Sequence, residues 1–158
     1  MNKNLFLLAL ALTLSCSANQ GSLKHPMDKS ESKTIKLENG LKVYLLSDPD
    51  FNVCAASMSV EVGSYQDPDN RQGMAHFLEH MLFLGTEKYP DVDEYSTYLK
   101  TFGGYSNAYT AGDHTNYQLQ VLPDGFEGSL DRFAQFFISP LFTEEYTCLL
   151  YTSDAADD

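Results

Sequence analysis

The segment HFLEH, residues 76–80, constrains the fold of this chain more than any other stretch. It lies in a mostly apolar run, residues 73–85, which we expect to form a helix that ends at its last glycine. Polar side chains that such a helix buries are costly unless they have partners. The fold must therefore provide partners for His76, Glu79 and His80, even if this is an ordinary core helix with incidental histidines.

A metal ion would satisfy these side chains together. Residues four apart share one helical face, so His76 and His80 can direct both imidazoles to one ion. Catalytic zinc takes three protein ligands and keeps one position for water, whose pKa it lowers to about 7. Glu79 leans toward the same face and can take a proton from that water and pass it to a leaving amine. The H-x-x-E-H pattern thus predicts a zinc hydrolase site, although two histidines and a carboxylate also suit iron.

The hydrophobic pattern of the whole chain predicts an α+β domain. Alternation with period two marks strands, and a period near 3.6 marks helices. In chain order we expect a hairpin at 34–48, a strand at 53–64, a helix at 73–85, a second helix that stops at 103–104, strand segments at 105–122 with a break at 111–113, and a helix from 126 that Pro140 ends. This order predicts a mainly antiparallel sheet with helices packed on one face.

Local signals refine several of these elements. Asn39-Gly40 predicts the turn of the hairpin. Asp91 and Glu94 have the spacing of a capping box, which predicts that the second helix is capped at Asp91. Residues 123–125, Pro-Asp-Gly, predict a turn before the last helix. The side chains expected on one buried face are Ala56, Met58, Val60 and Val62 in the third strand, and Leu130, Phe133, Ala134, Phe136 and Phe137 in the last helix.

Composition limits the partners and the cross-links of the chain. Its 158 residues are enough for one modest domain. The net charge of −12 argues against a nucleic-acid partner, because phosphate binding needs a basic surface. Three cysteines do not form a disulfide framework, and we expect Cys54 to be a small buried apolar residue.

The first 20 residues have the pattern of a bacterial export signal. Lys3 precedes an apolar run at residues 5–14, which is too short to span a bilayer, and small residues follow. Cys16 stands where a lipoprotein signal carries its acylated cysteine, and cleavage after Ala18 is the competing interpretation. We therefore expect a periplasmic protein with a possible lipid anchor; a buried N-terminal helix is the alternative. The polar residues 21–33 are predicted to be a linker.

Three stretches together resemble the pitrilysin/insulinase family of zinc peptidases, the M16 type. They are ENGLKVYLLSDP, GMAHFLEHMLFLGTEKYP and FGGYSNAYTAGDHTNYQLQV, and the likeness extends over residues 33–147. The resemblance implies the N-terminal part of an M16-like (LuxS-like) α+β domain at 34–147. It also implies zinc as the cofactor, His76 and His80 as zinc ligands, and Glu79 as the catalytic glutamate.

The same resemblance implies how substrates and partners are held. Ser106, Asn107 and Ala108 match the segment along which an extended peptide lies as an added strand. Family members enclose peptides in a chamber of several homologous domains. We therefore expect peptide substrates, further homologous domains as partners, and endopeptidase chemistry in which glutamate assists the attack of zinc-activated water.

The third zinc ligand is expected to be missing from this chain. The family spacing places a glutamate close to Asp157, but the sequence there, CLLYTSDAADD at 148–158, does not resemble the family. We therefore predict a non-native tail and an inactive fragment, with Asp157 as a ligand only by coincidence of spacing. His114 lies among polar residues at an expected strand start, so we do not expect it to be the third ligand. A non-catalytic M16-like partner or peptide-binding subunit and a structural lipoprotein are the alternatives.

Overall fold

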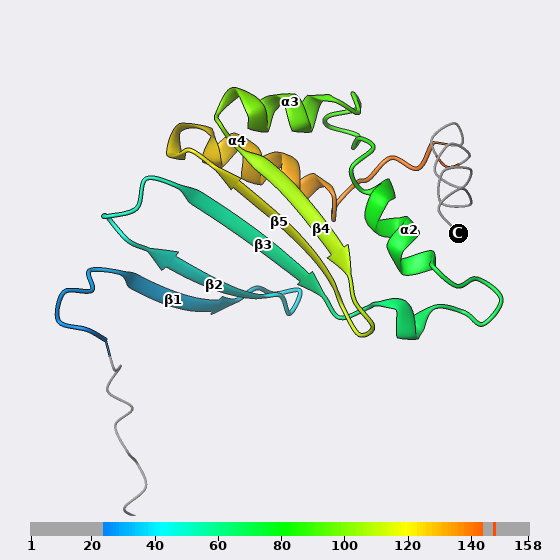
Figure 1. Cartoon of the computed structure of the whole chain (residues 1–158), viewed down its shortest axis with the longest axis horizontal. Coiled ribbons are helices and arrows are strands. Elements are labelled where there is room, and N and C mark those ends of the chain that lie inside the picture. The colour runs from blue at the N-terminus through cyan, green and yellow to red at the C-terminus, as the bar shows by residue number, and fades with distance from the viewer. Residues whose placement is uncertain (1–23, 144–146, 148–158) are drawn as a thin grey trace, which may run out of the picture. The chain divides into compact units, whose positions relative to one another are not determined.

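The computed structural model of the chain describes residues 24–143 and Thr147 (Figure 1). They fall into two compact units, which divide between Asp50 and Phe51. No helix among these residues is both long enough and apolar enough to cross a membrane.

Several predicted features lie outside the described residues. They are the export signal at 1–20 with Cys16, and the tail at 148–158 with Asp157. Export, lipidation, the tail's origin and ligation by Asp157 therefore stay predictions.

The first unit contains the predicted hairpin. Strand β1 (Glu31–Lys36) pairs antiparallel with β2 (Lys42–Ser47). The turn is confirmed: Gly40 has φ of 92°, and the side chain of Asn39 accepts a hydrogen bond of 3.1 Å from the Leu41 amide. Strand β1 includes the last three residues of the predicted linker at 21–33, because its polar, exposed first residues carry no hydrophobic signal.

The second unit contains a three-stranded antiparallel sheet in the order β3–β5–β4. Its strands are β3 (Cys54–Val60), β4 (Tyr105–Thr110) and β5 (Thr115–Val121). The predicted break at 111–113 is confirmed as the tight turn that joins β4 to the central strand β5. Strand β4 is thus an edge strand of the described sheet.

Strand β3 shows the predicted alternation of core-facing and exposed residues. Ala56, Met58 and Val60 pack against the core, while the residues between them are exposed. Two predictions here are wrong. Val62 lies beyond the strand and is 47% exposed, and Cys54 is only partly buried.

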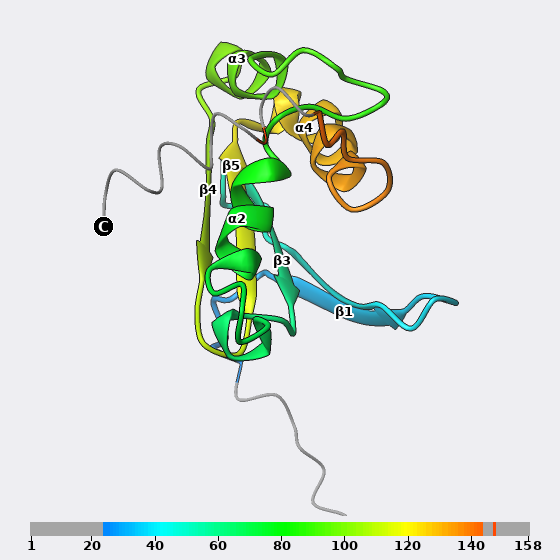
Figure 2. The ribbon, with the colours of Figure 1, turned by 90° about the vertical axis from the view of Figure 1, so that its right-hand side faces the viewer.

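Helices cover one face of this sheet, as predicted for an α+β domain. They are α2 (Met74–Met81), α3 (Glu94–Thr101) and α4 (Pro123–Gln135), with a short 3-10 turn, η1 (Ser64–Gln66). Helix α2 runs beside β4 and β5, α4 packs on β3 and β5, and α3 packs on α4 and β4 (Figure 2). The buried core between them contains Leu82, Tyr95, Leu99, Tyr117, Leu119, Val121, Phe133 and Phe136.

The metal-motif helix is shorter than predicted. It ends at Met81 rather than near Gly85. The residues that follow form turns in which each amide bonds to the carbonyl three residues earlier. The amide of Phe83 donates to the carbonyl of His80, and the amide of Leu84 donates to that of Met81. Gly85 then adopts φ of 101°, which explains why a glycine is needed there.

The predicted capping box is wrong, because both acidic residues have other partners. The carboxylate of Asp91 accepts a hydrogen bond from the amide of Asp93, and Asp93 occupies the N-cap position of α3 without a side-chain capping bond. Glu94 points away from the helix start and pairs with Arg132 on α4 at 2.5 Å. A tertiary ion pair has therefore replaced the local cap.

The predicted turn at 123–125 is also wrong, because α4 already begins at Pro123. Proline suits a first helical position, where its missing N–H has no intrahelical partner to lose. Phe133 and Phe136 lie on the buried face as predicted, but Leu130 is 41% exposed. The helix ends at Gln135, before Pro140, so that proline does not terminate it.

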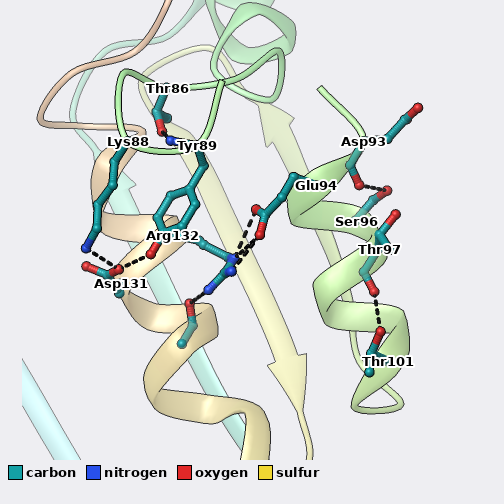
Figure 3. A network of polar contacts seen from close by, with 11 residues as sticks. Thr86, Lys88, Tyr89, Asp93, Glu94, Ser96, Thr97, Thr101, Asp131 and Arg132 are labelled. Atoms are coloured by element: carbon teal, nitrogen blue, oxygen red, sulfur yellow. Dashed lines mark hydrogen bonds and ion pairs between the residues drawn. The ribbon is translucent and has the colours of Figure 1, made fainter. Parts of the chain in front are cut away.

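Arg132 joins three segments of the second unit (Figure 3). Its guanidinium binds both carboxylate oxygens of Glu94. It also lies 4.3 Å from the ring centroid of Tyr89 and 3.7 Å from that of Tyr98. This clamp fixes α3 and the preceding loop to α4, and α3 leads directly into the edge strand β4.

Candidate metal centre

Helix α2 brings its two histidines together. His76 Nε2 and His80 Nε2 lie 3.0 Å apart, with ring centroids 4.6 Å apart and the rings tilted by 59°. Two nitrogens at 2.0–2.1 Å from a tetrahedral zinc ion would be about 3.3 Å apart. The distance also permits a hydrogen bond between the rings, but the convergence of both Nε2 atoms is what a shared cation requires.

The exposure of the three motif residues differs in a way that suits a metal site. His76 is exposed and His80 is half-buried, whereas Glu79 is only 6% exposed. The two ring nitrogens are therefore accessible to an ion from outside. The carboxylate lies deeper, toward the sheet.

One oxygen of Glu79 is held by the edge strand. The hydroxyl of Thr110 donates a hydrogen bond of 2.5 Å to Glu79 Oε2. Thr115 lies 3.4 Å from Thr110 but donates at 2.8 Å to the carbonyl of Val62. No donor among the described residues holds Oε1, which is therefore the oxygen available to exchange a proton with water.

A tyrosine completes the surroundings of this carboxylate. Burial, together with the negative charge of Glu79, raises the pKa of Tyr117 to about 12. The phenol therefore stays protonated at neutral pH. The sequence did not point to Thr110, Thr115 or Tyr117; their only signal is their inward position on two alternating strands.

The predicted peptide-binding segment lies on the edge strand. Asn107 faces outward and is exposed, while Ser106 and Ala108 face the helices and are half-buried. The amide of Ala111 donates a hydrogen bond of 2.8 Å to the carbonyl of His114, which identifies the residues of β4 and β5 that form hydrogen-bonded pairs. Odd-numbered residues of β4 therefore bond to β5, and even-numbered ones direct their N–H and C=O groups to the open edge. Substrate binding there stays a prediction.

A third ligand does not come from the described residues. Among residues 24–143 and 147, no cluster of three His, Cys, Asp or Glu side chains is placed to hold a metal. The Nδ1 atom of His114 lies 2.7 Å from the Asp113 carboxylate, and its ring packs edge-on against Tyr109. His114 thus has partners of its own, and α2 supplies two ligand nitrogens and a nearby carboxylate, which fit part of a zinc site.

Comparisons with known proteins identify a family for this chain. The family described as Insulinase (Peptidase family M16) matches residues 42–149. The insulin-degrading enzyme of Homo sapiens is 53% identical over 121 residues, which are 77% of this chain and 12% of that protein. The peroxisomal insulin-degrading enzyme-like 1 of Arabidopsis thaliana is 55% identical over 125 residues, which are 79% of this chain and 13% of that protein.

A solved structure supports the same assignment. The crystal structure of pitrilysin matches with a TM-score of 0.74 and 41% sequence identity, over 78% of this chain and 13% of that one. The chain therefore spans about an eighth of the length of the relatives it matches. Fold, family match and sequence identity lead to one conclusion: this chain belongs to the insulinase family of zinc metallopeptidases, peptidase family M16.

Proposed function

We propose that this chain is the part of a zinc endopeptidase that carries the metal-binding helix and the substrate edge strand. The observation that carries the proposal is the convergence of His76 Nε2 and His80 Nε2 at 3.0 Å, with Glu79 beside them and hydrogen-bonded to β4. Cleavage also needs a third ligand and the further domains of the longer relatives. On its own, the chain is expected to be inactive.

The two histidines would hold zinc, and the neutral imidazoles need only their Nε2 lone pairs to do so. Bound zinc supplies a Lewis acid that makes water acidic and polarises a carbonyl group. Glu79 then accepts a proton from water at Oε1, while water oxygen bonds to the carbonyl carbon of the peptide. As the C–N bond breaks, Glu79 returns that proton to the leaving nitrogen. Thr110 keeps the other carboxylate oxygen in place throughout.

The edge strand supports a substrate class for this reaction. Ser106, Ala108 and Thr110 direct main-chain groups to the open edge, so a peptide can bind there as an additional strand. Such pairing requires an extended segment, which folded proteins rarely offer. Thr110 belongs to this edge and also contacts Glu79, so a peptide bound along β4 would pass close to the general base.

A chimera would test the proposed function. Residues 24–147 would replace the matching segment of pitrilysin, which supplies the missing ligand and domains. We expect the chimera to cleave an internally quenched peptide, and Glu79→Gln to abolish turnover while zinc content stays unchanged. A folded, zinc-loaded chimera that binds peptide without cleaving it would favour a non-catalytic peptide-binding subunit. Robust turnover by the chain alone, lost in Glu79→Gln, would contradict the expectation of an inactive fragment.

A further inference from the structure

The carboxylate of Asp67 caps the metal-binding helix from outside it. Its Oδ2 accepts a hydrogen bond of 2.8 Å from the amide of Gly73, and its Oδ1 accepts one of 2.8 Å from the amide of Ala75. These are amides of the first turn of α2, which have no partners within the helix. We propose that Asp67 is a positioning residue that holds this turn, and with it the His76 imidazole, in the geometry for metal binding; this inference rests on the proposed function.

Helix α2 needs an external cap more than most helices. It has eight residues, and helices that short are marginal without tertiary support. Its N-cap residue, Gly73, has φ of 83° and no side chain that could accept an amide, and its first turn contains no acidic residue. Asp67 supplies both the acceptors and the negative charge that favour a helix start.

The two histidines depend differently on this cap. His76 lies in the first turn, directly after the capped amide of Ala75, whereas His80 lies in the last turn. If the first turn unwinds, His76 Nε2 leaves its position 3.0 Å from His80 Nε2. Loss of the cap should therefore separate the two ligands without removing either.

Asp67 is itself attached to the turn between β4 and β5. In the segment just before it, the amide of Ser64 donates to the carbonyl of Ala111 at 2.9 Å, and the amide of Tyr65 donates to that of Gly112 at 2.8 Å. The ring of Tyr65 lies so close to Gly112 that an added Cβ there would be 2.5 Å from it. The cap thus extends from a short segment that is anchored to the sheet.

The turn between β4 and β5 is also linked to helix α2 by a second contact, through Glu79. The residue before Ala111 is Thr110, which donates a hydrogen bond to Glu79 of the same helix. Helix α2 is therefore held to one strand turn at two points, once through Asp67 and once through Glu79. This arrangement fixes the metal-binding helix relative to the edge strand, although Asp67 contacts neither histidine.

Asp69 is a matched control in the same loop. It is exposed, carries the same charge, and makes no hydrogen bond among the described residues, whereas Asp67 is half-buried. Replacing either aspartate removes one negative charge from this loop. Only replacement of Asp67 removes the cap.

The test uses the full chain with Asp67→Ala, Asp67→Asn and Asp69→Ala. Zinc affinity would be measured by competition with a chromophoric chelator, and amide hydrogen exchange by NMR. We expect Asp67→Ala to weaken zinc binding about 10-fold to 100-fold, the range for removal of groups that orient ligands. The amides of Gly73 and Ala75 should exchange at least about 10-fold faster, because exchange follows local opening. Asp67→Asn, which retains one acceptor oxygen, should be intermediate, and Asp69→Ala should bind zinc within about twofold of wild type.

Two results would overturn the inference. One is unchanged exchange at Gly73 and Ala75 in Asp67→Ala, and the other is equal loss of zinc affinity in Asp67→Ala and Asp69→Ala. Protected amides of Leu119 and Val121 in the central strand would show that a variant is folded. If Asp67→Ala does not fold, Asp67→Asn carries the test, because its side chain has nearly the same shape. Zinc binding that survives His76→Ala would instead refute the metal centre of the proposed function, and the exchange data would still decide the role of Asp67.

Discussion

The hydroxyl of Thr110 lies 2.5 Å from Glu79 Oε2, so the edge strand β4 and helix α2 are joined by a hydrogen bond. Glu79 is 6% exposed, and a carboxylate buried that far needs a donor. The bond orients the proposed general base and stabilises its charge. It also couples the position of the base to the strand along which substrate is proposed to lie.

Thr110→Val should destabilise the domain by about 1–3 kcal/mol, because it leaves a buried carboxylate oxygen without its donor. Thr110→Ser keeps the hydroxyl and should recover most of that loss. Urea denaturation followed by circular dichroism measures both variants. If valine and serine had equal effects, packing of the methyl group rather than the hydrogen bond would explain the loss.

His76→Ala and His80→Ala should each weaken zinc binding by more than about 100-fold, since loss of a ligand costs at least as much as loss of a group that orients one. His114→Ala is the matched control, because its ring packs on Tyr109 and pairs with Asp113. Isothermal titration with zinc would compare the three variants. Comparable losses in all three would show that the metal is bound without the H-x-x-E-H pattern.

The stability of the fold should fall at high pH. Burial raises the pKa of Tyr117, and also that of Tyr95, to about 12 in the folded state, against 10.0 for an ordinary tyrosine. Below pH 10 both states keep these protons, and the stability is complete. Between pH 10 and 12 the unfolded chain releases them first, so each tyrosine lowers the free energy of unfolding by about 1.4 kcal/mol per pH unit.

Tyr117→Phe removes one of these two titrating groups. Between pH 10 and 12, the free energy of unfolding should therefore fall less steeply with pH in this variant. The slope should be smaller by the contribution of one tyrosine, about 1.4 kcal/mol per pH unit. Denaturation at several pH values, followed at a far-ultraviolet wavelength, measures the slope. An identical slope in wild type and Tyr117→Phe would show that this phenol does not titrate with unfolding.

Arg132→Ala should cost about 2 kcal/mol or more. It removes the bidentate partner of Glu94 and the contacts of the guanidinium with the rings of Tyr89 and Tyr98. The Arg132 side chain is only 15% exposed, so the loss leaves a partly buried carboxylate without its partner. Arg132→Lys should recover little, because an ammonium group cannot form both bonds and the stacking together. Lys88→Ala is the control: it breaks the pair with Asp131, in which the lysine is 53% exposed, and should cost under about 1 kcal/mol. Thermal unfolding compares the three.

Several elements of the fold could be predicted because their signals are local. Asn39-Gly40 marks the hairpin turn, and the alternation of Ala56, Met58 and Val60 marks a strand with one buried face. The spacing of His76 and His80 predicted that both rings would point to one place, and the structure has them 3.0 Å apart. In each case a few neighbouring residues are enough to determine the conformation.

Two predictions failed because interactions with distant parts of the chain outweigh local signals. Glu94 and Asp91 have the spacing of a capping box, yet Glu94 binds Arg132, which lies 38 residues away, because a partly buried bidentate ion pair is stronger than an exposed cap. Pro123 was expected to lie in a turn and instead begins a helix whose buried face, with Phe133, packs on the sheet.

The sequence by itself determined the order of strands and helices and the H-x-x-E-H pattern on α2, since short-range periodicity and spacing encode both, and its resemblance to known peptidases indicated the family of the chain. Only the tertiary structure decided what holds that pattern in place. Asp67 caps the helix from a preceding loop, and Thr110 binds Glu79 across 31 residues. Hydrogen bonds form where the fold brings donor and acceptor within about 3 Å, and no local rule of sequence spacing specifies that distance.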